Sequence, residues 1–242
     1  MHRYTGFLQA TLLFALFFTN LGISPIISSV KAINPSLENS SNEPQKLLEN
    51  LRISDLPARF EPGPPFLRQL ILKNFGSFQS YFQHNEPQTN NLSIFIDIEQ
   101  AELVLGMTSH LSTQQAIVQF DQALSRSDNR QMFVQELEKN LQAFGPLKIK
   151  QIEKLESSAI GDRSQAFRFQ ADAQGLPLTI FGEFVILRRN NAAAVVVIGS
   201  LNQPLDDLRV PELASRLDNR LIDSVWFGQE QLNEHNNFSS FR

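Results

Sequence analysis

The chain has 242 residues, of which 25 are Asp or Glu and 21 are Lys or Arg, so its formal net charge at pH 7 is −4. A negative net charge argues against nucleic-acid binding and against docking on an anionic membrane surface, because both favour basic patches. The sequence contains no cysteine, which excludes a disulfide-linked partner and leaves the hydrophobic core to hold the fold.

Residues 1–32 predict a signal peptide. Arg3 supplies a short positive region, an apolar run follows from Phe7 to Leu21, and the spacing of Val30 and Ala32 suits cleavage after Ala32. The alternative is an uncleaved membrane anchor, although the apolar run is shorter than the roughly 20 residues that span a bilayer. We therefore expect an exported protein and favour a cleaved leader over a retained one.

Polar stretches mark the limits of one domain. Residues 33–45 are rich in Asn and Ser and predict a flexible linker, while residues 228–242 predict a disordered tail. Residues 46–227 lie between them and form one candidate domain of ordinary size.

The first strong pattern in this domain is an aromatic segment over residues 66–82. Its apolar residues have the spacing of a helix stripe. The stretch from Pro62 to Pro65 and the polar residues 85–91 on its other side would let it move as a unit. Two interpretations stay open: a helix that covers the core, or an apolar surface that meets a partner. The residues that would make such a contact are Phe66, Phe75, Phe78, Tyr81 and Phe82.

Short elements follow the aromatic segment. Residues 92–98 and 102–111 alternate or run apolar as strands do. Helices are predicted over residues 112–126, which open on a capping-box pattern from Ser112, and over residues 128–144.

The clearest signal is a pair of apolar runs, "FVIL" and "AAAVVVI", separated by Arg188-Arg189-Asn190-Asn191. Strands that are apolar on both faces lie in the middle of a covered sheet, and Asn190-Asn191 tolerates the positive φ angles of a tight hairpin turn. We therefore expect Val196 to be buried, and Arg189 at the turn to tolerate substitution.

The rest of the domain completes the predicted fold. Residues 147–155 and 164–172 read as further strands, and residues 210–225 as a last helix with a buried stripe. The predicted fold class is α+β: an antiparallel sheet covered by helices on both faces. The buried stripe consists of Leu213, Leu217 and Leu221.

The sequence shows no catalytic, cofactor or metal motif. It has no cysteine nucleophile and no Gly-x-Ser-x-Gly, and its four histidines lack zinc-ligand spacing. Asp97 and Glu99 share a strand face, but two carboxylates alone make a weak cation site. The domain is therefore expected not to be an enzyme.

Several other polar residues have structural interpretations. Glu183 and Arg168 lie in predicted strands, where they would either pair or line a pocket. Asp162 is expected to shape a turn. Arg216 and Arg220 lie one helical turn apart and are expected to pair with Glu212.

The carboxy-terminal part resembles PsbP-like domains, which belong to the extrinsic proteins of photosystem II and their relatives. The resemblance rests on Gly161-Asp162, "AFRF", "GEFVILRRNNAAAVVVI" and "ELASRLDNRL". These residues are also similar to the extracellular sensor domains of mycobacterial PknH-type kinases, and "ISDLPARF" resembles the opening of uncharacterised exported cyanobacterial proteins. The resemblance implies an α/β/α sandwich in which a Gly-Asp loop precedes a strand, a long hairpin crosses the sheet and a final helix packs on it.

These observations favour a non-catalytic exported accessory or binding protein. By resemblance, it would assist a membrane complex such as a photosynthetic one, in the periplasm or thylakoid lumen. The alternative is a carrier that encloses a small apolar ligand, such as a lipid or pigment, between the sheet and residues 66–82.

Overall fold

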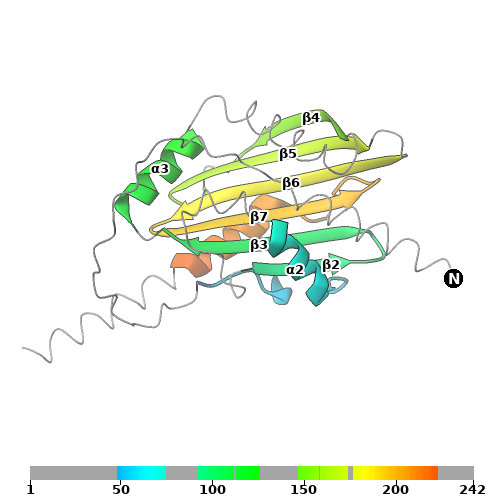
Figure 1. Ribbon diagram of the computed structural model, residues 1–242, viewed down its shortest axis with the longest axis horizontal. Coiled ribbons are helices and arrows are strands. Elements are labelled where there is room, and N and C mark those ends of the chain that lie inside the picture. Colours follow the sequence, from blue (N-terminus) through cyan, green and yellow to red (C-terminus); the bar gives the residue numbers. More distant parts are fainter. Residues whose placement is uncertain are drawn as a thin grey trace, which may run out of the picture.

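Seven antiparallel strands form one sheet in the computed structural model, in the order β1-β2-β3-β7-β6-β5-β4 (Figure 1). The strands are β1 Glu61–Pro62, β2 Leu92–Asp97, β3 Glu102–His110, β4 Leu147–Leu155, β5 Arg163–Ala173, β6 Leu178–Arg189 and β7 Ala192–Leu201. The structure describes residues 48–74, 92–111, 113–125, 147–157, 159–173, 177–205 and 207–222.

The two apolar runs of the sequence become β6 and β7, with β7 at the centre of the sheet. Every residue of β7 from Ala192 to Ser200 is buried, and Val196 is fully so. Strand residues alternate between the two faces, so burial of every position means that both faces of β7 are covered. Asn190 has φ 53° in the two-residue turn. The prediction of a central hairpin with a tight Asn turn is confirmed.

One face of the sheet carries a cluster that includes Leu105, Phe167 and Val195. Two helices contribute to it: α2 (Pro65–Asn74) and α3 (Gln114–Ser125). In Figure 1, α2 lies in front of β2 and β3, and α3 lies near one end of the sheet. The helical side chains in the cluster are Leu67 from α2 and Ala116, Phe120 and Leu124 from α3.

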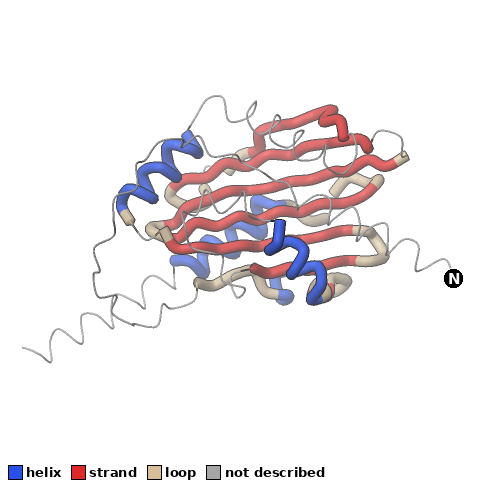
Figure 2. Tube along the Cα trace, viewed as in Figure 1, coloured by secondary structure: helices blue, strands red, loops and turns tan. Residues whose placement is uncertain are grey.

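The opposite face packs against the helix over residues 210–222 and against the segment over residues 48–60. Leu213, Leu217 and Leu221 are between 0% and 1% exposed, which confirms the predicted stripe. This helix runs behind the sheet in Figure 1. In Figure 2, more of the described chain is strand than helix. The predicted α+β class with an antiparallel sheet is therefore correct.

The boundaries differ from prediction in places. The hydroxyl of Thr113 accepts a hydrogen bond from the Ala116 amide at 3.1 Å, so Thr113 caps α3, one residue later than the predicted cap. The second predicted helix, over residues 128–144, lies outside the described residues. So do the predicted leader, linker and tail, namely residues 1–32, 33–45 and 228–242. Within the described ranges, no helix has the length and apolar character needed to cross a membrane.

Candidate functional site

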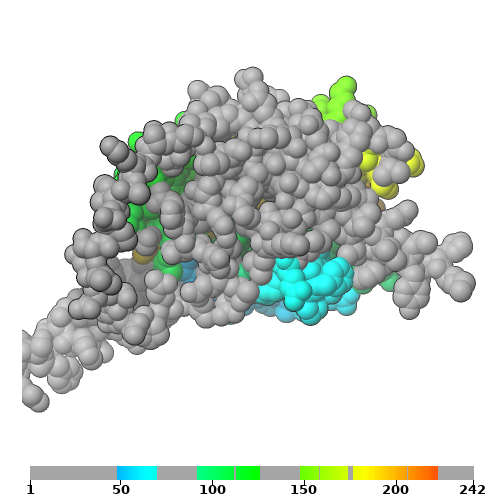
Figure 3. Space-filling view, viewed as in Figure 1, coloured from blue at the N-terminus to red at the C-terminus, as the bar shows by residue number. Residues whose placement is uncertain are grey.

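The aromatic segment singled out in the sequence begins as α2, which shows two different faces. Leu67 is 2% exposed and belongs to the core, whereas the neighbouring Phe66 is 47% exposed. The region around α2, in cyan, lies at the molecular surface in Figure 3. The prediction of a helix is thus met up to Asn74. The other predicted contact residues, Phe75, Phe78, Tyr81 and Phe82, lie outside the described residues.

The chain that leads into α2 is fastened to the sheet. Pro62 pairs with Phe95 in the β1–β2 ladder, and the Gly63 amide donates to the Ile94 carbonyl at 2.8 Å. A Cβ at Gly63 would lie only 2.7 Å from the Ile94 side chain. Strand pairing therefore holds the chain as far as Gly63, which leaves only Pro64 and Pro65 between this attachment and the segment, and its movement as a unit stays a prediction.

Arg168 and Glu183 form the cross-strand pair that the sequence indicated. They are partners in the β5–β6 ladder, and Nε of Arg168 lies 2.7 Å from Oε1 of Glu183. The other carboxylate oxygen accepts the Val210 amide at 3.1 Å, at the start of the last helix. The buried Glu183 therefore joins the sheet to the helix. Arg209 makes a longer contact of 3.4 Å with the same carboxylate.

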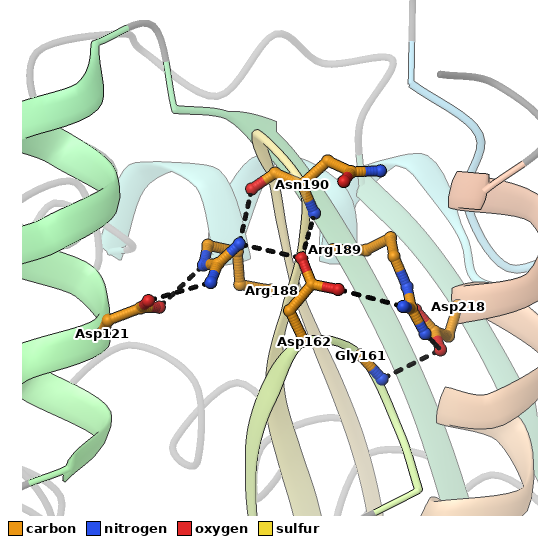
Figure 4. Close-up of polar contacts among 7 residues, drawn as sticks. All are labelled: Asp121, Gly161, Asp162, Arg188, Arg189, Asn190 and Asp218. Carbon is orange, nitrogen blue, oxygen red and sulfur yellow. Dashed lines mark hydrogen bonds and ion pairs between the residues drawn. The ribbon is translucent and has the colours of Figure 1, made fainter. Parts of the chain in front are cut away.

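The β6–β7 turn is the centre of a second polar network (Figure 4). Arg188 reaches α3, with Nε 2.7 Å and Nη2 2.8 Å from the two oxygens of Asp121. Its Nη1 donates to Asp162 at 2.9 Å and to the Asn190 carbonyl at 2.8 Å. Asp162 also accepts the Asn190 amide at 2.7 Å, so it shapes the turn as predicted. The hydrogen bond to Asp121 raises the pKa of Arg188.

Arg189 extends the network to the other face of the sheet. Its guanidinium donates two hydrogen bonds to Asp218 of the last helix and one to Asp162 at 3.0 Å. The hydrogen bond to Asp218 raises the pKa of Arg189. Asp218 accepts the Gly161 amide as well, at 2.9 Å. Figure 4 shows the two arginines pointing in opposite directions, so the turn ties α3 and the last helix to one point.

Arg59 forms a third centre, which sequence analysis missed. Its guanidinium lies 2.7 Å from Asp97, 2.6 Å from Glu102 and 2.6 Å from Asp207. The second oxygen of Asp97 accepts the Glu99 amide at 2.9 Å. One oxygen of Asp97 therefore faces Arg59 and the other accepts a turn amide. These contacts give the carboxylate a structural role that needs no bound cation. No local pattern could have indicated this centre, because its members lie far apart in the chain.

Arg216 and Arg220 hold the segment over residues 48–60 in place. Arg220 donates to the Asn50 carbonyl at 2.9 Å and pairs with the buried Asp55, and Arg216 donates to the Asp55 carbonyl. The predicted pairing with Glu212 is therefore not found: both arginines cross to the amino-terminal segment, where Arg220 meets the Asp55 carboxylate and Arg216 meets a backbone carbonyl.

These centres share one chemical feature. Each buried carboxylate among the described residues lies within ion-pair distance of an arginine. A carboxylate held in this way joins two segments of the chain through an ion pair. Within the same residues, no group of three or more His, Cys, Asp or Glu side chains could hold a metal ion. The buried carboxylates are Asp55, Asp97, Glu102, Glu183 and Asp218.

Against known proteins, no family model matches the chain, and no curated protein is significantly similar to it.

Proposed function

We propose that this chain is a non-catalytic exported accessory protein that binds a membrane complex through the surface of α2. The resemblance to PsbP-like domains makes a photosynthetic complex the first partner to test, in the periplasm or thylakoid lumen. The cross-linked sheet then serves as a rigid support for that surface.

The observation that carries the proposal is the exposure of Phe66. A large aromatic side chain that is 47% exposed stands beside the core residue Leu67, on a helix whose entry is hydrogen-bonded to β2. Aromatic residues supply large contact areas with few rotatable bonds, and they are enriched where proteins meet. Phe66 is therefore a contact residue held at a defined position.

The resemblance adds support of a weaker kind. A loop with Gly161-Asp162 precedes β5, the β6–β7 hairpin crosses the sheet, and a helix over residues 210–222 packs on it. These are the elements that the resemblance implies. We also propose the finer version of the fold, a PsbP-like sandwich with helices over both faces.

The test is affinity capture from native membranes with tagged wild-type protein and two surface variants. Phe66→Ser removes the proposed contact, and Val118→Ser removes a comparably exposed apolar side chain, 44% exposed, on α3. We expect both variants to melt like the wild type. Phe66→Ser should lose the complex that the wild type recovers, and Val118→Ser should keep it. Equal recovery by all three proteins would contradict the proposal.

A second arm addresses the carrier alternative. Organic extraction of the purified protein, followed by mass spectrometry, would reveal a bound lipid or pigment. A stoichiometric apolar ligand, together with membrane capture that does not depend on Phe66, would replace the accessory role with that of a carrier.

A further inference from the structure

A groove of about 300 Å³ opens beside Glu183, on the sheet face that carries the helix over residues 210–222. Its floor is formed by polar side chains of β4 and β5 and by Phe181 of β6. Its wall is the loop that leads into the helix, which contributes Pro204, Leu205 and Arg209. The volume lies at the lower end of small-molecule sites.

Two arginines share one carboxylate in this groove. Arg168 and Arg209 both contact Oε1 of Glu183, whose side chain is 1% exposed, while Oε2 is taken by the Val210 amide. The side chains of Arg168 and Arg209 are 40% and 47% exposed. One negative charge at the floor therefore faces two positive charges with access to solvent.

Arg168 and Arg209 each have N–H donors that Glu183 does not use and that could bind a ligand. Arg168 uses Nε and Nη2 on Glu183, and no described residue accepts a hydrogen bond from its Nη1. Arg209 uses only Nη1, in a contact of 3.4 Å. Because Glu183 fixes the Arg168 side chain, the remaining donor is held in place before a ligand arrives, which lowers the entropic cost of binding.

The remaining lining narrows the class of ligand. Phe181, Pro204 and Leu205 give the groove an apolar side, and Gln170 adds an amide at the floor. Glu153 also lines the groove and accepts a hydrogen bond from Gln151, so it places a negative charge beside the arginines. The two arginines favour an anion only beside their remaining donors, because Glu183 and Glu153 place negative charge elsewhere in the groove. This position lies next to the apolar side.

We propose that this groove binds a small organic carboxylate with an apolar body. The carboxylate meets Nη1 of Arg168 and the guanidinium of Arg209, and the apolar body lies on Phe181 and Leu205. Arginine donors suit a carboxylate because their fork geometry matches its two oxygens. This site is separate from the α2 surface, which lies with the other face of the sheet, and its test does not depend on the accessory role.

The probe is 3-phenylpropionate, with its neutral amide as the matched control. Each is titrated into the full chain, and binding is followed by NMR chemical shifts. We expect the acid to bind saturably. The amide should bind at least about tenfold more weakly, because it lacks the charge-assisted hydrogen bonds. Arg209→Gln should weaken binding of the acid about tenfold. Its melting temperature should be unchanged, since its contact with Glu183 is long.

Glu153→Gln separates a ligand site from a merely structural role, because it removes the negative charge beside the arginines. It should tighten binding of the acid by a factor of about two to five, as expected for loss of a like charge at the surface. Arg163→Gln, at the first residue of β5 and outside the groove lining, should change nothing. Failure of the wild type to bind the acid, equal binding of acid and amide, or binding unaffected by Arg209→Gln would each overturn the proposal. Binding of inorganic phosphate without 3-phenylpropionate would overturn the apolar half of it.

Discussion

Arg189 of β6 and Asp218 of the last helix form a two-point ion pair, with Nε 2.7 Å from Oδ1 and Nη2 2.5 Å from Oδ2. The Asp218 side chain is only 5% exposed, so removing its partner would leave a buried carboxylate without an ion pair. The pair fastens the helix to the hairpin at the point where Arg188, the preceding residue, fastens α3.

Arg189→Ser should therefore destabilise the domain, contrary to the tolerance expected from a turn position. Removing the arginine leaves the Asp218 carboxylate buried with the Gly161 amide, and we expect a loss of about 2 kcal/mol in the free energy of unfolding. Urea unfolding measures it. Arg163→Ser, which removes an exposed arginine from β5, is the control and should cost little. Equal midpoints for the two variants would show that the ion pair is not needed.

Gly161→Ala should cost at least about 2 kcal/mol, because Gly161 has φ 66° and a left-handed backbone is unfavourable for alanine. The new Cβ would also lie 2.6 Å from the Arg188 carbonyl oxygen, so the loop would have to leave the hairpin. Asn190→Gly is the control: it introduces a glycine at another residue with positive φ, 53°, and should be nearly neutral. Thermal melts of both variants test the argument; a stable Gly161→Ala protein would refute it.

Arg220→Gln should loosen the segment over residues 48–60. It removes the charge that neutralises buried Asp55, and we expect a loss of about 2 kcal/mol together with faster amide hydrogen exchange in that segment. Glu212→Gln tests the pairing expected from the sequence and should change neither quantity. If Glu212→Gln were the more damaging change, the contacts of Arg220 with the amino-terminal segment would not be the important ones.

Glu102→Gln should change the pH dependence of stability. Burial raises the pKa of Glu102 above its ordinary value of 4.5, and repulsion from the charges of Asp207 and Asp97 raises it further, so Arg59 offsets the rise only in part. Between 4.5 and the raised pKa, the folded protein binds more protons at this residue than the unfolded chain does. The wild type therefore gains stability as pH falls through this interval, and the variant lacks this gain.

Urea unfolding of both proteins at pH 7 and near pH 4.5 provides the measurement. The stability of Glu102→Gln relative to the wild type should be highest at pH 7 and should fall at the lower pH. A difference that is the same at both pH values would mean that Glu102 titrates alike in the folded and unfolded chain.

Sequence patterns predicted the parts of the fold that depend on neighbours in the chain. Two-sided apolarity placed β7 at the centre, four-residue spacing identified Leu213 and Leu217 as buried, and strand positions suggested the pairing of Arg168 with Glu183. Each of these signals lies within a single element or hairpin, where period and spacing are sufficient.

Contacts between distant segments could not be predicted in the same way. Arg59 bonds to Asp207, which is 148 positions away, and Arg220 bonds to Asp55, which is 165 positions away. Which charges meet depends on strand order and on the path of segments over the sheet, and neither leaves a local period. The sequence left open that Arg168 and Glu183 line a pocket, but it could not define the groove for the same reason, since its wall comes from the loop that contributes Pro204 and Arg209.

The strand order also dictates when the sheet can be completed as the chain is made. Strands β4 to β7 follow one another as hairpins, but β3 finds its second neighbour only in β7, with Glu102 opposite Ser200. Non-local pairing of this kind is slow, and an unpaired apolar strand invites association between chains. Until residues 192–201 emerge, β3 presents such an edge. A chain stalled before Ala192 would thus be the species most prone to aggregate during its own synthesis.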